Sequence, residues 1–397
     1  MAKNDVAKRK NRRKDPMLGL VICLVLFTAL AVGAWYAAGQ LQTYRANLLA
    51  EQRQEVENRN AEKQAAYNTE KQAYLQEISS NQANKSWPAA KAEGWDVIDL
   101  TTYPLEAPGK ITVNRADVMY GGMLLVNEWH SRPSDFDEST IVAIHTYSRD
   151  SGLESFVDGS SCKLHPVAID ALIALLKDAK TLGYDHYVVQ KGYNFRSWDE
   201  QNELFTNKLN SIRESRPNLT EDQLVVRAKR EVNYPGTSEF NSGMSFCLYL
   251  YEGEEGEVKQ YYKETPFYQT PDGQWLLENA WKYGFVFRFP TVGYPTADTV
   301  DKTYKTGMSQ RLNLYRYVGK GHAAVMNHLD LCLEEYVEYL QEHPHIAVFE
   351  NGVKKYEITR QQVGDDVASF SVDINRLTNN YTMSLDNFGG LITVYEY

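Results

Sequence analysis

The chain has 397 residues, of which 12% are aromatic and 24% charged, and its formal net charge is -10 at pH 7. This composition is typical of a folded protein, with room for one good-sized globular domain and additional segments. Residues 1–16 hold seven Lys/Arg and two acidic residues, so the rest of the chain has 35 Lys/Arg against 50 Asp/Glu, a charge of about -15. That excess of negative charge argues against nucleic acid as a partner.

The basic tail, residues 1–16, is followed at 17–39 by an uncharged apolar run, MLGLVICLVLFTALAVGAWYAAG. A run of this length can cross a bilayer as a helix. The basic residues before it predict a cytoplasmic N-terminus, with everything from residue 40 onward outside the cell membrane. A cleaved signal peptide is the alternative, although the run is longer than a typical signal core. The membrane is therefore a predicted partner, through a single-pass anchor.

Residues 40–86 are expected to form a helical stalk. From residue 41 this segment contains no Gly or Pro, and it balances six acidic residues with six basic ones. If fully helical, it would be on the order of 65 Å long. Its weak heptads leave a coiled-coil dimer as a minor possibility, and a flexible polar linker as the alternative.

The four cysteines do not indicate a disulfide scaffold, because Cys23 lies within the apolar run. Cys162, Cys247 and Cys332 lie outside it. One bridge among these three is compatible with the sequence, but the pair is open.

From Trp87 onward the pattern becomes globular, and residues 87–343 are expected to form the main domain. Apolar spacing and turn residues predict helices at 165–184, 197–212, 220–232, 271–284 and 321–341, and strands at 186–193, 243–251, 284–289 and 314–319. Helices and short strands do not alternate regularly, which predicts an α+β fold. After Pro344, alternating segments with Asn-Gly and Gly-Gly turns predict β-hairpins, so residues 344–397 are interpreted as a C-terminal β extension.

Four blocks in the main domain carry a family resemblance. In chain order they are KGYNFRSWDEQNELF, YPGTSEFNSGMSFCL, WLLENAWKYGFVFRFP and LYRYVG with the helical segment after it. Over roughly residues 95–340, this order resembles the D-alanyl-D-alanine carboxypeptidases of the vancomycin-resistance type. The resemblance implies the mixed α+β fold of that zinc peptidase group, and a bacterial cell-wall peptide ending in D-Ala-D-Ala as partner.

The family's zinc requires three protein ligands and one position for the attacking water. In the family, a Ser-x-His-x-x-Gly-x-Ala-x-Asp block supplies His and Asp, and a Glu-x-x-His block supplies a second His and the general base. The first block aligns with residues 238–247, which puts Phe240 and Cys247 at ligand positions. The second block puts Leu314 at the remaining His and Arg311 at the base.

Phe and Leu have no donor atoms, and the guanidinium of Arg311 stays protonated, so it cannot take a proton from water. We therefore predict no zinc or other cofactor, and we expect Phe240, Cys247 and Leu314 to fill the former metal cavity as core. Ligation by His322 or His328 instead is the alternative.

The resemblance also implies a substrate side. Arg196 and Gln201 align with the pair that holds the peptide's terminal carboxylate in the family, with Asn194 and Phe195 inserted before them. Ser238 aligns with a residue that borders the pocket, and Arg311 would add positive charge there. The alternatives are a surface Arg196 paired with Asp199 or Glu200, a Ser238 that only caps a turn, and an Arg311 that only pairs with an acidic residue.

Three classes of function remain open on the sequence. The favoured one is a membrane-anchored pseudoenzyme outside the cytoplasm that binds wall peptides or regulates wall metabolism. The second is an active D,D-carboxypeptidase with relocated zinc ligands. The third is a non-catalytic envelope scaffold with a protein partner.

Overall fold

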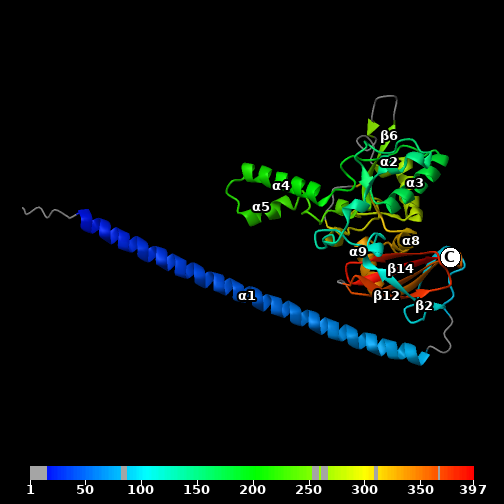
Figure 1. Cartoon of the computed structure of the whole chain (residues 1–397), viewed down its shortest axis with the longest axis horizontal. Coiled ribbons are helices and arrows are strands. Elements are labelled where there is room, and N and C mark those ends of the chain that lie inside the picture. The colour runs from blue at the N-terminus through cyan, green and yellow to red at the C-terminus, as the bar shows by residue number, and fades with distance from the viewer. Residues whose placement is uncertain (1–15, 82–86, 253–258, 261–266, 308–311, 365–366) are drawn as a thin grey trace, which may run out of the picture. The chain divides into compact units, whose positions relative to one another are not determined.

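The computed structural model describes residues 16–81, 87–252, 259–260, 267–307, 312–364 and 367–397 (Figure 1). The chain divides into two compact units, Met1–Ala83 and Asn84–Tyr397. In the first unit, α1 (Pro16–Asn81) is one continuous helix. Its segment Leu24–Tyr44 is long and apolar enough to cross a membrane, a property that it shares with signal sequences.

The second unit combines short helices with small antiparallel sheets, so the predicted α+β class is confirmed. Its α-helices in the described residues are α2 (Ile144–Tyr147), α3 (Pro166–Thr181), α4 (Trp198–Ser215), α5 (Glu221–Ala228), α6 (Pro271–Asn279), α7 (Thr303–Thr306), α8 (Lys320–Leu329) and α9 (Leu333–Glu342). A short 3-10 helix, η4 (Glu239–Ser242), precedes the strand β6.

In the part of the chain that the structure describes, two larger sheets and two strand pairs make up the β-structure. The first sheet has the order β5 (Tyr187–Val189), β6 (Ser245–Glu252), β9 (Leu314–Tyr317) and β8 (Phe285–Phe287), with β7 (Lys259–Gln260) paired to β6. The second has the order β1 (Trp95–Asp99), β10 (His345–Glu350), β11 (Val353–Gln362), β14 (Gly390–Glu396) and β13 (Tyr381–Leu385). The pairs are β2 (Pro108–Asn114) with β12 (Ser369–Asn375) and β3 (Val142–Ala143) with β4 (Lys163–Leu164).

Helix α3 packs against the first sheet and forms the largest part of its core. His165 caps the helix by accepting a hydrogen bond from the Val167 amide, and Pro166 occupies the first turn, where its missing N–H costs nothing. Apolar residues then recur at helical spacing on the buried face: Ala168, Ile169, Leu172, Leu175, Leu176 and Ala179. This stripe joins one hydrophobic core with residues of β5, β6 and β9.

The second sheet is covered on both faces. Helices α8 and α9 pack over one face, with Val325, Val337 and Leu340 in the same core as residues of β10, β11 and β14 (Figure 1). The β2–β12 pair supplies Val113, Phe370 and other residues to a separate core with β13 and β14. The sheet is therefore a middle layer, as its apolar sequence requires.

The predicted helix 321–341 is wrong as a single element. It breaks at Asp330, whose backbone is in the left-handed region with φ 52°, and α9 starts anew at Leu333. The carboxylate of Glu335 accepts a hydrogen bond from the Cys332 amide at 3.0 Å. This cap stabilises the start of the second helix. In the sequence, the residues of the cap continue the helical pattern of α8, so the break is not apparent.

The C-terminal strands share a sheet with the start of the domain. The predicted Asn-Gly turn joins β10 and β11, with φ of 50° at Asn351 and 77° at Gly352. However, β10 also pairs with β1, and β12 pairs with β2. Residues 95–114 and 345–396 therefore build one structure, although they stand at opposite ends of the domain sequence.

Candidate functional site

The three residues predicted at ligand positions lie together in one small apolar cluster. Phe240 comes from η4, and Cys247 and Leu314 are paired partners on the adjacent strands β6 and β9. Phe289 completes the buried part of the cluster, and Tyr193 packs against it from a partly buried position. Phe240 is 6% exposed, Leu314 1% and Cys247 0%, so water has almost no access to these side chains.

The backbone of Cys247 forms two hydrogen bonds with the segment 190–193. Its amide donates to the Tyr193 carbonyl at 2.8 Å, and its carbonyl accepts from the Gln190 amide at 2.9 Å. The segment that carries the predicted peptide-binding residues therefore lies directly beside this part of β6.

Arg196 and Gln201 contact each other at the edge of the apolar cluster. The Nη1 of Arg196 donates to Oε1 of Gln201 at 3.2 Å, and its Nη2 donates to the Gly192 carbonyl at 2.7 Å. The guanidinium carbon of Arg196 lies 4.8 Å from the ring centroid of Phe240. The predicted carboxylate-binding pair and the predicted ligand positions are thus parts of one site.

Asn194 and Phe195, the two residues predicted as an insertion, are buried. The side chain of Asn194 accepts a hydrogen bond from the Lys163 amide at 3.0 Å and donates to the Gln190 carbonyl at 3.0 Å. The Phe195 amide donates to the Lys163 carbonyl at 3.1 Å. The insertion therefore forms its own contacts with the strand β4 and leaves Arg196 next to Phe240.

Ser238 lies at the start of η4 and is buried. Its amide donates to the side-chain oxygen of Asn241 at 3.2 Å, and its carbonyl accepts from the Asn241 amide at 2.8 Å. The side-chain nitrogen of Asn241 in turn donates to the Arg196 carbonyl at 2.9 Å. Ser238 thus starts the turn that attaches Phe240 to Arg196.

Next to this site is a buried ion-pair network that the sequence did not predict. Arg288 donates to Oε2 of Glu239 at 2.8 Å, and to the two carboxylate oxygens of Glu334 at 3.0 and 2.6 Å. Arg316 pairs with Oε1 of Glu239, and the Ser245 hydroxyl donates to the same oxygen at 2.6 Å. Burial raises the pKa of Glu239, but the charges of Arg288 and Arg316 outweigh it and lower that pKa to about 2.

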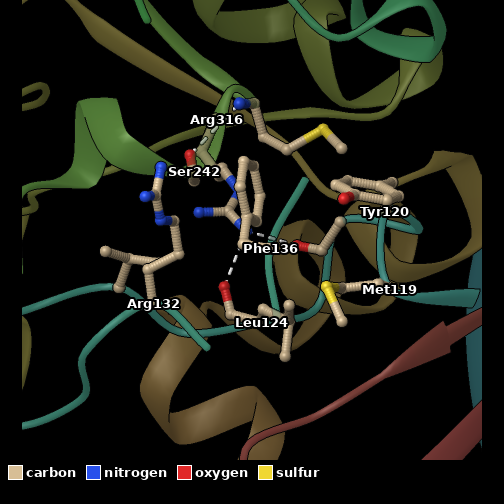
Figure 2. A pocket seen from close by; sticks show the side chains of 10 residues that line it. Met119, Tyr120, Leu124, Arg132, Phe136, Ser242 and Arg316 are labelled. Carbon is tan, nitrogen blue, oxygen red and sulfur yellow. Dashed lines mark hydrogen bonds between the residues drawn. The ribbon is translucent and has the colours of Figure 1, made fainter. Parts of the chain in front are cut away.

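Arg316 also connects the network to residues 119–136. Its Nη2 donates to the carbonyls of Gly122 and Leu124 at 2.7 and 2.8 Å. Figure 2 shows Arg316 with Ser242, Phe136 and Tyr120 around a small cavity. The volume of the cavity is about 10 Å³, which suits at most a single water molecule. This space is too small for a peptide ligand.

Comparison with known proteins identifies the fold around this site. Residues 161–319 match the VanY family, described as D-alanyl-D-alanine carboxypeptidase. The chain carries a VanY-family domain. The matched range contains α3, η4, β6 and β9, and therefore includes every residue of the apolar cluster.

The similarity to curated proteins covers more of the chain than the VanY-family match does. A D-alanyl-D-alanine carboxypeptidase of Enterococcus faecium is 29% identical over 283 residues, which cover 71% of this chain and 77% of the relative. The putative carboxypeptidase YodJ of Bacillus subtilis is 29% identical over 217 residues, covering 54% of this chain and 67% of YodJ. The solved D,D-dipeptidase VanXYg, crystallised with a D-Ala-D-Ala phosphinate analogue, shares the fold with a TM-score of 0.50 and 19% identity, over 73% of this chain and 99% of VanXYg.

The side chains of the VanY-family domain do not fit the zinc that the resemblance implied. Phe240 and Leu314 offer no donor atom, and Cys247 alone cannot hold a catalytic metal that needs three protein ligands. Among the residues that the structure describes, no three His, Cys, Asp or Glu side chains come together as a metal site. No step of hydrolysis can therefore be assigned to these side chains.

His322, the alternative ligand, is in the core away from this cluster. It lies with Tyr336, whose hydroxyl is 2.8 Å from its Nδ1, and burial lowers its pKa to about 3. Arg311, predicted at the position of the base, falls outside the described residues. Cys162, Cys247 and Cys332 are buried thiols without disulfide bonds.

Proposed function

We propose that this protein is a membrane-anchored, non-catalytic relative of the D-alanyl-D-alanine carboxypeptidases that binds cell-wall peptides or regulates wall metabolism. The observation that carries the proposal is the packing of Phe240, Cys247 and Leu314 into a single buried apolar cluster. Polar ligands left without their metal would be costly at such a place, and apolar residues remove that cost. The cluster has the character of core rather than of a reaction centre.

The loss of hydrolysis follows from the chemistry of the donors. A catalytic zinc lowers the pKa of its bound water and polarises the carbonyl group that is attacked. Phe240 and Leu314 can do neither, because they have no atoms with a lone pair to offer. Arg311, at the aligned base position, cannot accept a proton at neutral pH.

Peptide binding is supported by the side of the site that keeps its polar residues. Arg196 has a planar fork of N–H groups that matches a carboxylate, and Gln201 is placed against it by a hydrogen bond. Ser238 borders the same place through η4. We infer that the terminal carboxylate of a stem peptide ending in D-Ala-D-Ala binds at Arg196, with Arg311 as a second positive charge.

The membrane anchor rests on the apolar segment of α1 and the basic residues that precede it. Segment Leu24–Tyr44 has the length and composition for one bilayer crossing. The seven Lys/Arg of residues 1–16 favour a cytoplasmic N-terminus. In this topology the VanY-family domain lies outside the membrane, where wall peptides are.

Peptide binding is tested by titrating the full chain, in detergent micelles, with a wall pentapeptide ending in D-Ala-D-Ala. We expect saturable binding without release of D-alanine, and a loss of at least about tenfold in affinity for Arg196→Ala, because a charge-assisted bidentate contact is removed. Arg213→Ala is the matched control, since Arg213 forms an ion pair with Glu221 on the α4–α5 surface. Failure to bind would favour an envelope scaffold, and release of D-alanine would favour an active enzyme.

A further inference from the structure

Two exposed aromatic rings lie on the chain segments that carry Arg196 and Ser238. Trp198, the first residue of α4, is 42% exposed, and Tyr234, four residues before Ser238, is 44% exposed. Such rings offer a ligand a large apolar face together with a polar edge.

Trp198 is held firmly although its ring is exposed. A Cβ atom at Gly236 would lie 2.2 Å from Cζ3 of Trp198, so the indole packs directly on the backbone of that glycine. The Trp198 amide donates to Oε1 of Glu138 at 2.7 Å. On either side of it in the chain, Ser197 and Glu200 form a reciprocal capping box that fixes the start of the helix.

Tyr234 is held along the same helix. Its ring packs edge-on against Phe205 of α4, with a centroid distance of 5.2 Å and an interplanar angle of 74°. The preceding carbonyl, of Asn233, accepts a hydrogen bond from Nε2 of Gln201 at 2.8 Å. The turn 233–236 therefore lies along the face of α4 that carries residues 198, 201 and 205, and this spacing is that of one helix face.

This aromatic surface, defined as Trp198 and Tyr234, is tied to the proposed carboxylate site through the buried side chain of Gln201. Gln201 connects the two, since its Oε1 accepts from Arg196 and its Nε2 donates to the Asn233 carbonyl. Trp198 also follows Arg196 by two residues, so the rings and the carboxylate site belong to one hydrogen-bonded part of the fold. Rings that are fixed in advance lose little conformational entropy on binding.

We propose that the aromatic surface binds a sugar ring of the wall fragment whose peptide end lies at Arg196. This inference rests on the proposed function, because the stem peptide and its sugar belong to one molecule. A pyranose has a C–H face that packs on an aromatic ring and hydroxyls that stay in water, and a half-exposed ring offers both environments. Arg196 would then fix the peptide end, and Trp198 and Tyr234 the glycan end.

The surroundings of the aromatic surface favour a sugar over an acyl chain. The Nζ of Lys229 lies 5.1 Å from the Tyr234 ring centroid, and Asp199 is the next residue along α4 from Trp198. These charged groups stay hydrated and would be desolvated by a hydrocarbon chain, at a cost in free energy. A sugar can keep its hydroxyls and these groups in contact with water.

The test compares two ligands on the full chain in detergent micelles: a disaccharide-pentapeptide and the same pentapeptide without sugar. We expect the disaccharide to raise the affinity by about tenfold, the scale of two aromatic contacts. In Trp198→Ala and in Tyr234→Ala this gain should fall below about threefold, and Trp198→Phe should keep most of it. Trp129→Ala is the matched control, because Trp129 is also exposed, at 55%.

The outcomes separate this inference from the proposed function. Equal affinities of the wild type for the two ligands, or a gain that survives in both alanine variants, would overturn the sugar contact and leave peptide binding intact. If neither ligand binds, the proposed function fails and the sugar contact fails with it. A circular dichroism spectrum of each variant that matches the wild type shows that the fold is kept.

Discussion

The guanidinium carbon of Arg196 lies 4.8 Å from the ring centroid of Phe240, so the predicted peptide-binding arginine stacks on a predicted metal-ligand position. The Arg196 amide also donates to the Phe240 carbonyl at 3.1 Å. A ring at this place supports the guanidinium from the side where a metal ion and its positive charge would repel it. The proposed loss of the zinc and the proposed carboxylate-binding role of Arg196 are therefore compatible.

Replacing Phe240 by Ala should destabilise the second unit. Phe240 is buried with Cys247, Leu314 and Phe289, and removal of a buried phenylalanine ring costs about 3–5 kcal/mol. Denaturant unfolding of the full chain measures the change, with Phe240→Leu as a control that should cost clearly less because it keeps much of the apolar volume. A loss below about 1 kcal/mol for the alanine variant would contradict its assignment to the core.

Glu239→Gln should be far more costly than its small change in shape suggests. Arg288 and Arg316 would share one neutral amide where they now share a carboxylate, and a buried pair broken on one side loses about 3–5 kcal/mol. The matched control is Glu221→Gln, at an exposed pair with Arg213, which should change the stability by less than about 1 kcal/mol. Equal effects of the two substitutions on the free energy of unfolding would argue against the network.

The stability of the second sheet should fall as the pH is lowered from about 5 to 2. Burial raises the pKa of Glu357, but hydrogen bonds from His345, Tyr397 and Asn375 outweigh it and lower that pKa to about 2. Because the folded-state pKa lies below the unfolded value, this contribution is present above about pH 4.5 and is lost as the pH falls through the folded value.

The size of the Glu357 contribution is at most about 3 kcal/mol, from the difference between the two pKa values. Thermal unfolding at several pH values measures it. In Glu357→Gln the pH dependence between 5 and 2 should be weaker than in the wild type. An unchanged slope would show that other carboxylates cause the loss.

Introducing the family's three donor residues should give the protein a zinc site. In the triple variant Phe240→His, Cys247→Asp and Leu314→His, three donors replace three residues of one cluster. We expect the variant to be less stable than the wild type without metal, because its new polar groups are buried and unpaired, and to gain thermal stability on addition of zinc. The wild type is the control, and a variant that zinc does not stabilise would mean that these positions are misaligned.

The sequence predicted the cluster because two motifs, 238–247 and the block before Tyr315, gave the positions of Phe240, Cys247 and Leu314 by register alone. It missed the network of Glu239, Arg288, Arg316 and Glu334, since those residues come from four separate segments. A signal was present, because Arg288 and Arg316 each stand within an apolar strand segment, where an unpaired charge would be too costly.

The positions of helices and strands in the chain were predicted better than the pairing of the strands. Helix α3 follows its apolar spacing, and the turn at Asn351 and Gly352 follows its composition. The pairing of β10 with β1 depends on contacts between residues about 250 positions apart, and no local pattern specifies such a partner. The break at Asp330 was missed because the residues on both sides continue a helical pattern.

Whether the protein is non-catalytic is tested most directly by the zinc content of the purified full chain after zinc loading and dialysis, measured together with D-alanine release from a wall pentapeptide. We predict zinc far below one equivalent and no release of D-alanine, because Phe240 and Leu314 provide no ligand. Near-stoichiometric zinc together with D-alanine release would contradict it and would identify the protein as an active carboxypeptidase.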